Sequence, residues 1–134
     1  MMKAEQIEVK TTKRREFVDV TEQVRQVVSK SLVSEGTCVL WVPHTTAAVT
    51  VNENADPDVQ RDMLFGTERF VPAHDGYHHQ EGNSDAHILS SLFGPSLTLI
   101  ISEGELVLGT WQGIYFCEFD GARHRRLLVK VQSD

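Results

Sequence analysis

The stretch Gly109–Arg123, GTWQGIYFCEFDGAR, combines strand-forming residues with an unusual density of polar groups. Polar side chains in an apolar run cost stability unless they have partners or a function. At the two-residue period of a strand, one face holds Tyr115, Cys117 and Phe119, and the other holds Ile114, Phe116 and Glu118. The stretch therefore predicts a strand whose polar residues contribute to a site, with Cys117 favoured as a small core residue over a reactive thiol.

Asp120-Gly121 follows this strand and precedes a second apolar run, Arg125 to Val131. An Asp-Gly pair between two strand-like runs is a strong hairpin signal. The sequence therefore predicts that residues 114–119 pair with residues 125–131. Arg123, Arg125 and Arg126 lie beside this turn, where they suit either a phosphate-binding cluster or, for the last two, a charged edge strand.

Apolar periodicity predicts the other elements outward from this region. Strands are expected over residues 4–11, 17–20, 37–42, 47–51, 97–101 and 106–108. Helices are expected from Asp19 or Thr21 to about Leu32, from Asp56-Pro57, and from Asn83 or Ser84 to Leu92. Because the helices are grouped, not alternating with every strand, we expect an α+β fold with about three helices and mainly antiparallel sheet.

Composition narrows the class of protein. The chain has 134 residues, which predicts one domain over residues 1–134, and its net charge of -6 argues against nucleic-acid or membrane-surface binding. We expect no signal peptide and no membrane span, because the N-terminus lacks an apolar segment and no apolar run approaches 18 residues. Cys38 and Cys117 are then free thiols of a cytoplasmic protein, with a disulfide as the disfavoured alternative.

Two further segments hold residues suited to binding. His44, Thr45 and Thr46 follow a proline at a strand end, where they either bind an anion or a metal, or form a locally bonded turn. In the acidic segment Asn52–Asp56, carboxylates could bind Mg²⁺. Asp56 is favoured as a helix cap, and Glu53 remains undecided.

His79 and His87 are eight residues apart, with Glu81 between them. Neutral imidazoles beside a carboxylate suit Zn²⁺, and the helix N-terminus at Asn83-Ser84 would attract phosphate. We therefore expect His79 and His87 to meet, together with His44. Incidental histidines in a solvent loop are the alternative, and this is the interpretation favoured for His74 and His78.

Three motifs coincide in order and spacing: Pro43–Ala47 with Asn52–Asp56, Glu81–His87, and Leu108–Gly121. With them the chain resembles the secondary thiamine-phosphate synthase family, the YjbQ-like proteins. The resemblance implies an α+β fold built on a β-sandwich and a homotrimer about a threefold axis. It also implies a transferase activity, weak or secondary, that joins a pyrimidine diphosphate to a thiazole phosphate, giving thiamine phosphate and pyrophosphate.

The resemblance and the residues together give an expected site for a small phosphorylated metabolite and a divalent metal, Mg²⁺ or Zn²⁺. Catalysis is assigned to His79, Glu81, His87 and Gln112, and metal binding to His44, His79 and His87. Substrate or phosphate binding is assigned to His44, Thr45, Thr46, Asn83, Ser84 and Arg123. Two alternatives stay open: a zinc-dependent hydrolase with Glu81 as base, and a trimeric metabolite-binding module without catalysis.

Overall fold

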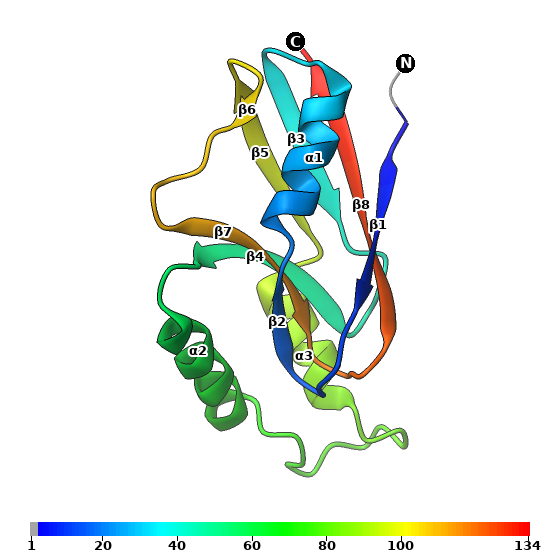
Figure 1. Ribbon diagram of the computed structural model, residues 1–134. Helices are drawn as coiled ribbons and strands as arrows, with labels where there is room; N and C mark the ends of the chain where they lie inside the picture. The colour runs from blue at the N-terminus through cyan, green and yellow to red at the C-terminus, as the bar shows by residue number, and fades with distance from the viewer. Residues whose placement is uncertain (1–2) are drawn as a thin grey trace.

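A computed structural model describes residues 3–134 and shows two antiparallel β-sheets with three helices among those residues (Figure 1). The elements are β1 (Glu5–Lys10), β2 (Glu16–Asp19), α1 (Thr21–Ser31), β3 (Gly36–Trp41), β4 (Ala47–Glu53), α2 (Pro57–Phe70), α3 (Ser84–Phe93), β5 (Ser96–Ser102), β6 (Glu105–Leu106), β7 (Gln112–Glu118) and β8 (His124–Ser133). One sheet has the strand order β1-β8-β3-β5-β6, and the other has the order β2-β7-β4. The expected α+β class is confirmed.

The main core lies between α1 and the two sheets. The N-cap of α1 is Val20, which makes no side-chain capping bond, and Asp19 just before it accepts from the backbone N–H of Thr21 at 2.9 Å. Val24 and Val28 then face inward and are buried, so the apolar stripe read from the sequence is the packed face of the helix. Leu40 of β3 and Phe116 of β7 join them in the same cluster.

A second, smaller core packs α3 against β4 and β7. It contains Leu89 together with Cys117 and Phe119, and the Ser90 hydroxyl donates to the carbonyl of Ala47 at 2.7 Å. The predicted face of β7 is thereby confirmed as a packing surface. Complete burial raises the pKa of the Cys117 thiol well above its ordinary value, so packing accounts for this residue. Cys38 is also buried, and both thiols are free.

The hairpin predicted around Asp120-Gly121 is wrong. β7 pairs with β2 on one edge and with β4 on the other, whereas β8 pairs with β1 and β3 in the five-stranded sheet. Since both edges of β7 are occupied, β8 has no free edge of β7 to join. Residues 119–123 instead carry the chain from one sheet to the other, and this crossover becomes one wall of the site described below.

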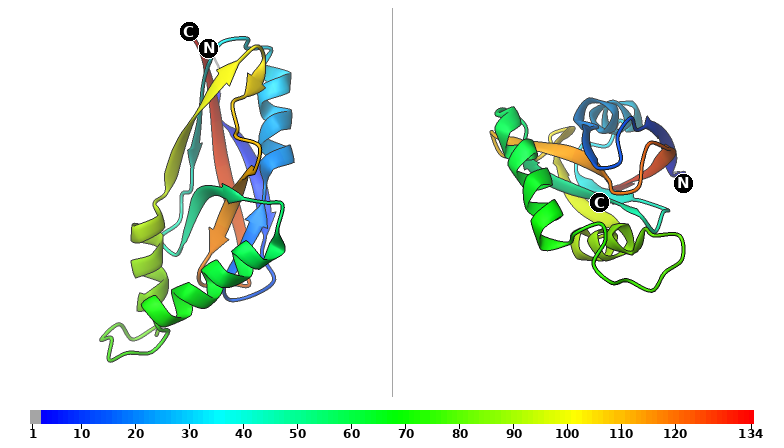
Figure 2. Two further views of the ribbon diagram at one scale, coloured as in Figure 1. Left: turned by 90° about the vertical axis from the view of Figure 1, so that its left-hand side faces the viewer. Right: turned by 90° about the horizontal axis from the view of Figure 1, so that it is seen from below.

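The remaining helix and its loop lie at the end of the molecule opposite the chain termini (Figures 1 and 2). α2 begins as predicted, because Asp56 accepts from the N–H of Asp58 at 2.9 Å and Pro57 occupies the first turn. The loop from residue 71 to residue 83 leads from α2 to α3. Over residues 3–134, no helix is long and apolar enough to cross a membrane.

We predict that Gly121→Ala destabilises the protein by about 1–3 kcal/mol, because the added methyl overpacks a closed site. A Cβ at Gly121 would lie 2.2 Å from the carbonyl oxygen of Lys13, and backbone there cannot swing away. Urea unfolding gives the difference in free energy. The matched control is Gly66→Ala in exposed α2, where a Cβ meets nothing within 4 Å and alanine should stabilise the helix by about 0.5–1 kcal/mol. Equal stability of the two variants would contradict the packing of the crossover.

Candidate functional site

The three segments singled out in the sequence meet at one cleft of about 570 Å³. Its walls come from the β3–β4 connection, from the loop before α3 with the first turn of that helix, and from the β7–β8 crossover. The lining residues are Pro43, His44, Thr45, Thr46, His79, Glu81, Asn83, His87, Asp120, Arg123 and Arg125. Eight of the expected site residues therefore share one cavity: His44, Thr45, Thr46, His79, Glu81, Asn83, His87 and Arg123.

A buried ion pair, Glu118–Arg125, forms the base of the cleft and joins the two sheets. Arg125 Nε donates to Glu118 Oε1 at 2.9 Å, and its Nη2 reaches both Oε2 of the same carboxylate and Thr46 Oγ1, the latter at 2.8 Å. Glu118 also accepts from the hydroxyl of Thr11 at 2.7 Å and from the N–H of Asp120 at 3.0 Å. The partners of this pair thus come from three connections, β1–β2, β3–β4 and β7–β8.

The hydrogen bonds keep Glu118 ionised despite complete burial. Burial by itself raises the pKa of this carboxyl, but the donors from Arg125, Thr11 and Asp120 outweigh it, and the pKa is lowered overall. Arg125 is thus the buried partner of Glu118, and because β8 lies between β1 and β3, its interpretation as a charge on an edge strand is wrong. The sequence analysis missed the role of Glu118. Its place on the same strand face as Ile114 and Phe116 was a usable signal, because a carboxylate on a buried face needs a cationic partner.

A second buried carboxylate, Asp85, anchors the start of α3. It accepts from Arg14 through two bonds of 3.0 Å and from Arg15 Nη2 at 2.6 Å. Burial raises the pKa of Asp85, but both guanidinium groups oppose this effect and the pKa is lowered overall. These contacts tie the first turn of α3 to the β1–β2 connection, and they fix the positions of Asn83 and His87 on either side. The sequence showed Arg14 and Arg15 only as a basic turn.

Asn83 and Asp120 join the α3 wall to the crossover. Asn83 Nδ2 donates to Asp120 Oδ2 at 2.9 Å, and Arg123 holds the same residue through its carbonyl at 2.7 Å and its carboxylate at 3.0 Å. Asn83 Oδ1 is buried without a hydrogen-bond partner. An unpaired buried acceptor is costly, so this atom is available to a donor on a ligand. Ser84, expected beside Asn83, does not line the cleft.

His79 and His87 lie with ring centroids 5.6 Å apart and rings nearly perpendicular. A turn closed by the Gly82 N–H on the His79 carbonyl, at 3.1 Å, folds the loop back toward α3. His87 is on the first two turns of that helix and is half-buried, whereas His79 is exposed at the rim. The predicted meeting of these two imidazoles is present in the structure.

His44 is held in one neutral tautomer. Its Nε2 accepts from the backbone N–H of Arg126 at 3.0 Å, so in the neutral ring the proton is on Nδ1. The ring also packs edge-on against Phe116, with centroids 6.4 Å apart. Burial lowers the pKa of His44, and the positive charge of Arg125 lowers it further.

The expected three-histidine metal centre does not fit these residues. Among residues 3–134, no group of three or more histidine, cysteine, aspartate or glutamate side chains is arranged to hold a metal ion. The physical reason at His44 is that a neutral imidazole has a single free lone pair, and that lone pair accepts from Arg126. We therefore assign neither Mg²⁺ nor Zn²⁺ to His44, His79 and His87.

One other expected site residue, Gln112, lies away from the cleft. Gln112 pairs with Glu53 at the end of β7 and β4 remote from Glu118, and its side chain accepts from the N–H of Gly109 at 2.7 Å. His74 and His78 are exposed and do not line the cleft, in line with the interpretation favoured for them.

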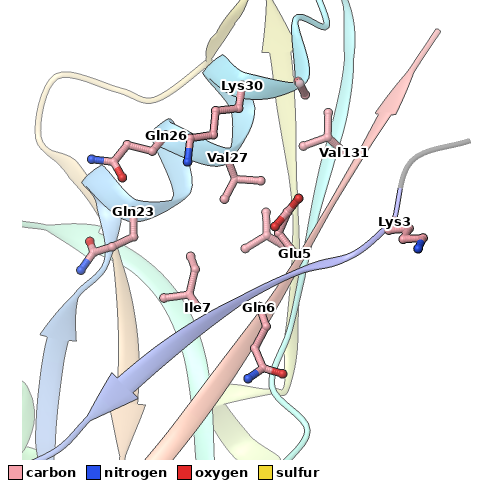
Figure 3. Close-up of a pocket in the computed structure, with 11 residues that line it drawn as sticks. Lys3, Glu5, Gln6, Ile7, Gln23, Gln26, Val27, Lys30 and Val131 are labelled. Atoms are coloured by element: carbon pink, nitrogen blue, oxygen red, sulfur yellow. The ribbon is translucent and has the colours of Figure 1, made fainter.

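Another cavity, of about 390 Å³, lies between α1 and the edge formed by β1 and β8 (Figure 3). Its floor is apolar, with Ile7, Val27 and Val131, and its rim includes Glu5 and Lys30. Among the residues that the structure describes, its lining contains no histidine and no residue of the three motifs. The histidine-lined cleft is therefore the better candidate for chemistry.

We predict that Glu118→Gln costs about 3–5 kcal/mol of stability at pH 7, because it leaves Arg125 as a buried, unpaired charge. The folded-state pKa of Glu118 is lowered, so its contribution is present above the unfolded value of about 4.3 and is lost as the pH falls below it. The difference in free energy of unfolding between wild type and variant, measured in urea, should therefore be largest at neutral pH and should narrow as the pH falls through the lowered folded-state pKa. Glu105→Gln, at an exposed carboxylate on β6, serves as the control. A gap that widens on acidification would contradict the assignment.

Curated relatives match nearly the whole chain. UPF0047 protein MJ1081 of Methanocaldococcus jannaschii is 50% identical over 127 residues, which cover 95% of this chain and 92% of that protein. UPF0047 protein YugU of Bacillus subtilis is 47% identical over 128 residues, covering 95% of this chain and 97% of that protein.

Solved structures agree with the fold. A YjbQ-like protein of unknown function from Sulfolobus solfataricus superposes with a TM-score of 0.96 at 33% identity, covering 100% of this chain and 99% of that chain. An uncharacterised conserved protein of the YjbQ/UPF0047 family from Clostridium acetobutylicum gives a TM-score of 0.93 at 50% identity, covering 95% and 98%.

These relatives overturn the functional expectation. The two solved proteins are called uncharacterised or of unknown function, and none of the four relatives is named as a thiamine-phosphate synthase, a hydrolase or a metabolite-binding module. The zinc-dependent alternative also fails on the geometry of the histidines. The expected transferase function and both alternatives to it are therefore wrong. The family itself is shown: residues 5–134 match the model of the UPF0047 protein YjbQ-like family, and the chain belongs to that family.

Proposed function

We propose that the protein is a metal-independent enzyme that transfers protons on a small anionic metabolite. The observation that carries this proposal is the pair of imidazoles, His79 and His87, 5.6 Å apart in a cleft that also contains a partly free arginine. Histidine is the side chain best suited to accept and donate protons near neutral pH. Two such rings at one cavity can remove a proton from one atom of a substrate and return it to another.

Arg123 supplies the anchor for an anionic group. Its Nε and Nη2 hold Asp120, while Nη1 makes no hydrogen bond within residues 3–134. The side chain is 52% exposed and faces the cleft, so a carboxylate or a phosphate can reach it. Asn83 Oδ1 adds an acceptor for a hydroxyl or amine on the same ligand. Small metabolites with an anionic end and one donor group match this arrangement.

We predict that the protein catalyses exchange of a carbon-bound hydrogen with solvent deuterium in at least one small anionic metabolite. The measurement is ¹H NMR in D₂O with a panel of carboxylates and phosphate esters, with and without carbonyl groups. His79→Ala and His87→Ala should each lower the exchange rate by about 10²–10⁴, as expected for loss of a general acid or base. His74→Ala, at an exposed histidine outside the cleft, is the matched control. Undiminished exchange in both cleft variants would contradict the proposal.

We also propose that the protein assembles as a homotrimer, following the threefold symmetry that the sequence resemblance implied. Trp41 and Ile100 are 48% and 61% exposed, and each neighbours a buried residue, Leu40 or Ile101, on its strand. Their side chains therefore lie on the face of the five-stranded sheet opposite the main core. Exposed large apolar side chains on a sheet face support an interface there.

We propose a cytoplasmic location for the protein, and its two free, buried thiols support this proposal.

Light scattering at micromolar concentration should give three times the 15.1 kDa mass of the chain. Ile100→Glu should shift the mass toward that of one chain, because it would bury a carboxylate without a partner at the interface. Leu32→Glu, at an exposed leucine in the α1–β3 turn, should leave the mass unchanged. A wild-type mass of one chain would refute the assembly.

A further inference from the structure

We infer that His44 donates its Nδ1 hydrogen to a substrate oxygen that gains negative charge, which makes the substrate a carbonyl compound with an acidic C–H bond. This inference rests on the proposed function, because it needs His79 or His87 as the base. It goes further by naming the group that stabilises the product of proton removal and by restricting the class of substrate.

The tautomer of His44 follows from its backbone contact. A backbone N–H can only donate, so the 3.0 Å contact between Arg126 N and His44 Nε2 requires a lone pair on Nε2. The neutral ring then carries its proton on Nδ1. No protein acceptor within residues 3–134 binds that nitrogen, while the residue lines the cleft. A donor without a protein partner at a cavity is placed for a ligand.

The charges around His44 favour the neutral ring. Arg125, at the base of the cleft, and Arg126, on the adjoining strand, oppose a positive charge on the imidazole, while Glu118 favours it from across the ion pair. Burial opposes the charge most strongly, so the pKa of His44 is lowered overall. A neutral imidazole cannot give its Nδ1 proton away easily, but it can hydrogen-bond to developing negative charge without transferring the proton.

The position of the ring is fixed before any ligand arrives. Phe116 packs edge-on against it, and the Arg126 N–H donates to its Nε2. Donors held in place stabilise developing charge most effectively, because they need no rearrangement during the reaction. In this cleft the fixed donor, His44, comes from the β3–β4 connection, and the exposed rim imidazole, His79, comes from the loop before α3.

The step balances without a cofactor. The C–H bond next to the carbonyl breaks, and its proton goes to the free lone pair of His79 or His87. The electron pair of that bond forms a C=C bond, and the carbonyl π pair moves to oxygen, giving an enolate. The enolate oxygen accepts the hydrogen bond from His44 Nδ1. Nucleophilic attack by a thiol is not an alternative here, since both Cys38 and Cys117 are buried.

The first test is the tautomer, and it needs no substrate. Long-range ¹H–¹⁵N NMR of ¹⁵N-histidine-labelled protein at pH 7 should show His44 with a protonated Nδ1 and an unprotonated Nε2. Exposed His124, two positions before Arg126 on β8, is the internal reference. A proton on Nε2 of His44, or a charged ring at pH 7, overturns the inference and leaves the roles of His79 and His87 untouched.

The second test is deuterium exchange by two matched sets of probes, 2-oxo acids such as pyruvate and 2-oxobutyrate, and 2-hydroxy acids such as lactate and malate. The 2-oxo acids should exchange and the 2-hydroxy acids should not. His44→Ala should lower kcat for exchange by about 10²–10³ with a much smaller change in KM, as for loss of one oxyanion donor. His124→Ala should behave as wild type.

Each result decides between the two claims. Exchange that is lost in His79→Ala or His87→Ala but unchanged in His44→Ala overturns the role of His44 and retains the proton-transfer enzyme. Exchange of the 2-hydroxy acids as fast as that of the 2-oxo acids also overturns the role of His44 and retains the proton-transfer enzyme. If no member of either set exchanges, the carbonyl class is overturned, whereas the proton-transfer proposal is judged on the rest of the wider panel.

Discussion

The ion pair between Glu118 and Arg125 is the constraint on which the arrangement of this molecule depends. Glu118 ends β7 of one sheet and Arg125 begins β8 of the other, so the pair joins the sheets where the chain crosses between them. Thr11, Thr46 and Asp120 complete its hydrogen bonds. A buried ion pair without full satisfaction would destabilise the fold. The hydrogen bonds of this pair fix the relative positions of the segments that form the cleft.

The functional chemistry follows from what these contacts leave free. Arg125 is buried and bound through Nε and Nη2, whereas the exposed Arg123 keeps a donor for a ligand and Asn83 keeps an acceptor. The imidazoles divide in the same way: His44 is bound to the backbone on one side, whereas His79 and His87 meet each other at the rim. A cleft with one fixed donor and two imidazoles suits proton transfer on an anion better than it suits a metal ion.

Local patterns predicted most elements and the meeting of the three motifs. Apolar periodicity marked the inward face of α1, and Asp56-Pro57 marked the start of α2, because both signals are local. The sequence failed at Asp120-Gly121, since a turn signal cannot show that β2 and β4 already occupy both edges of β7. It also missed the pair of Asp85 with Arg14 and Arg15, which lie far away in the chain, and the pair of Glu118 with Arg125, which is near in the chain but belongs to the other sheet. The predicted metal centre is wrong because the one free lone pair of neutral His44 accepts from the Arg126 N–H. The sequence does not show this contact, since it depends on how the strands are placed.

The central claim is that this cleft transfers protons without a metal. The most direct measurement is the rate of carbon–hydrogen exchange by protein treated with a strong chelator and shown by elemental mass spectrometry to be free of zinc and other transition metals. The account predicts that metal-free protein keeps its full rate and that added zinc or magnesium does not raise it. Loss of exchange on metal removal, with recovery on adding one equivalent of zinc per chain, would contradict the account.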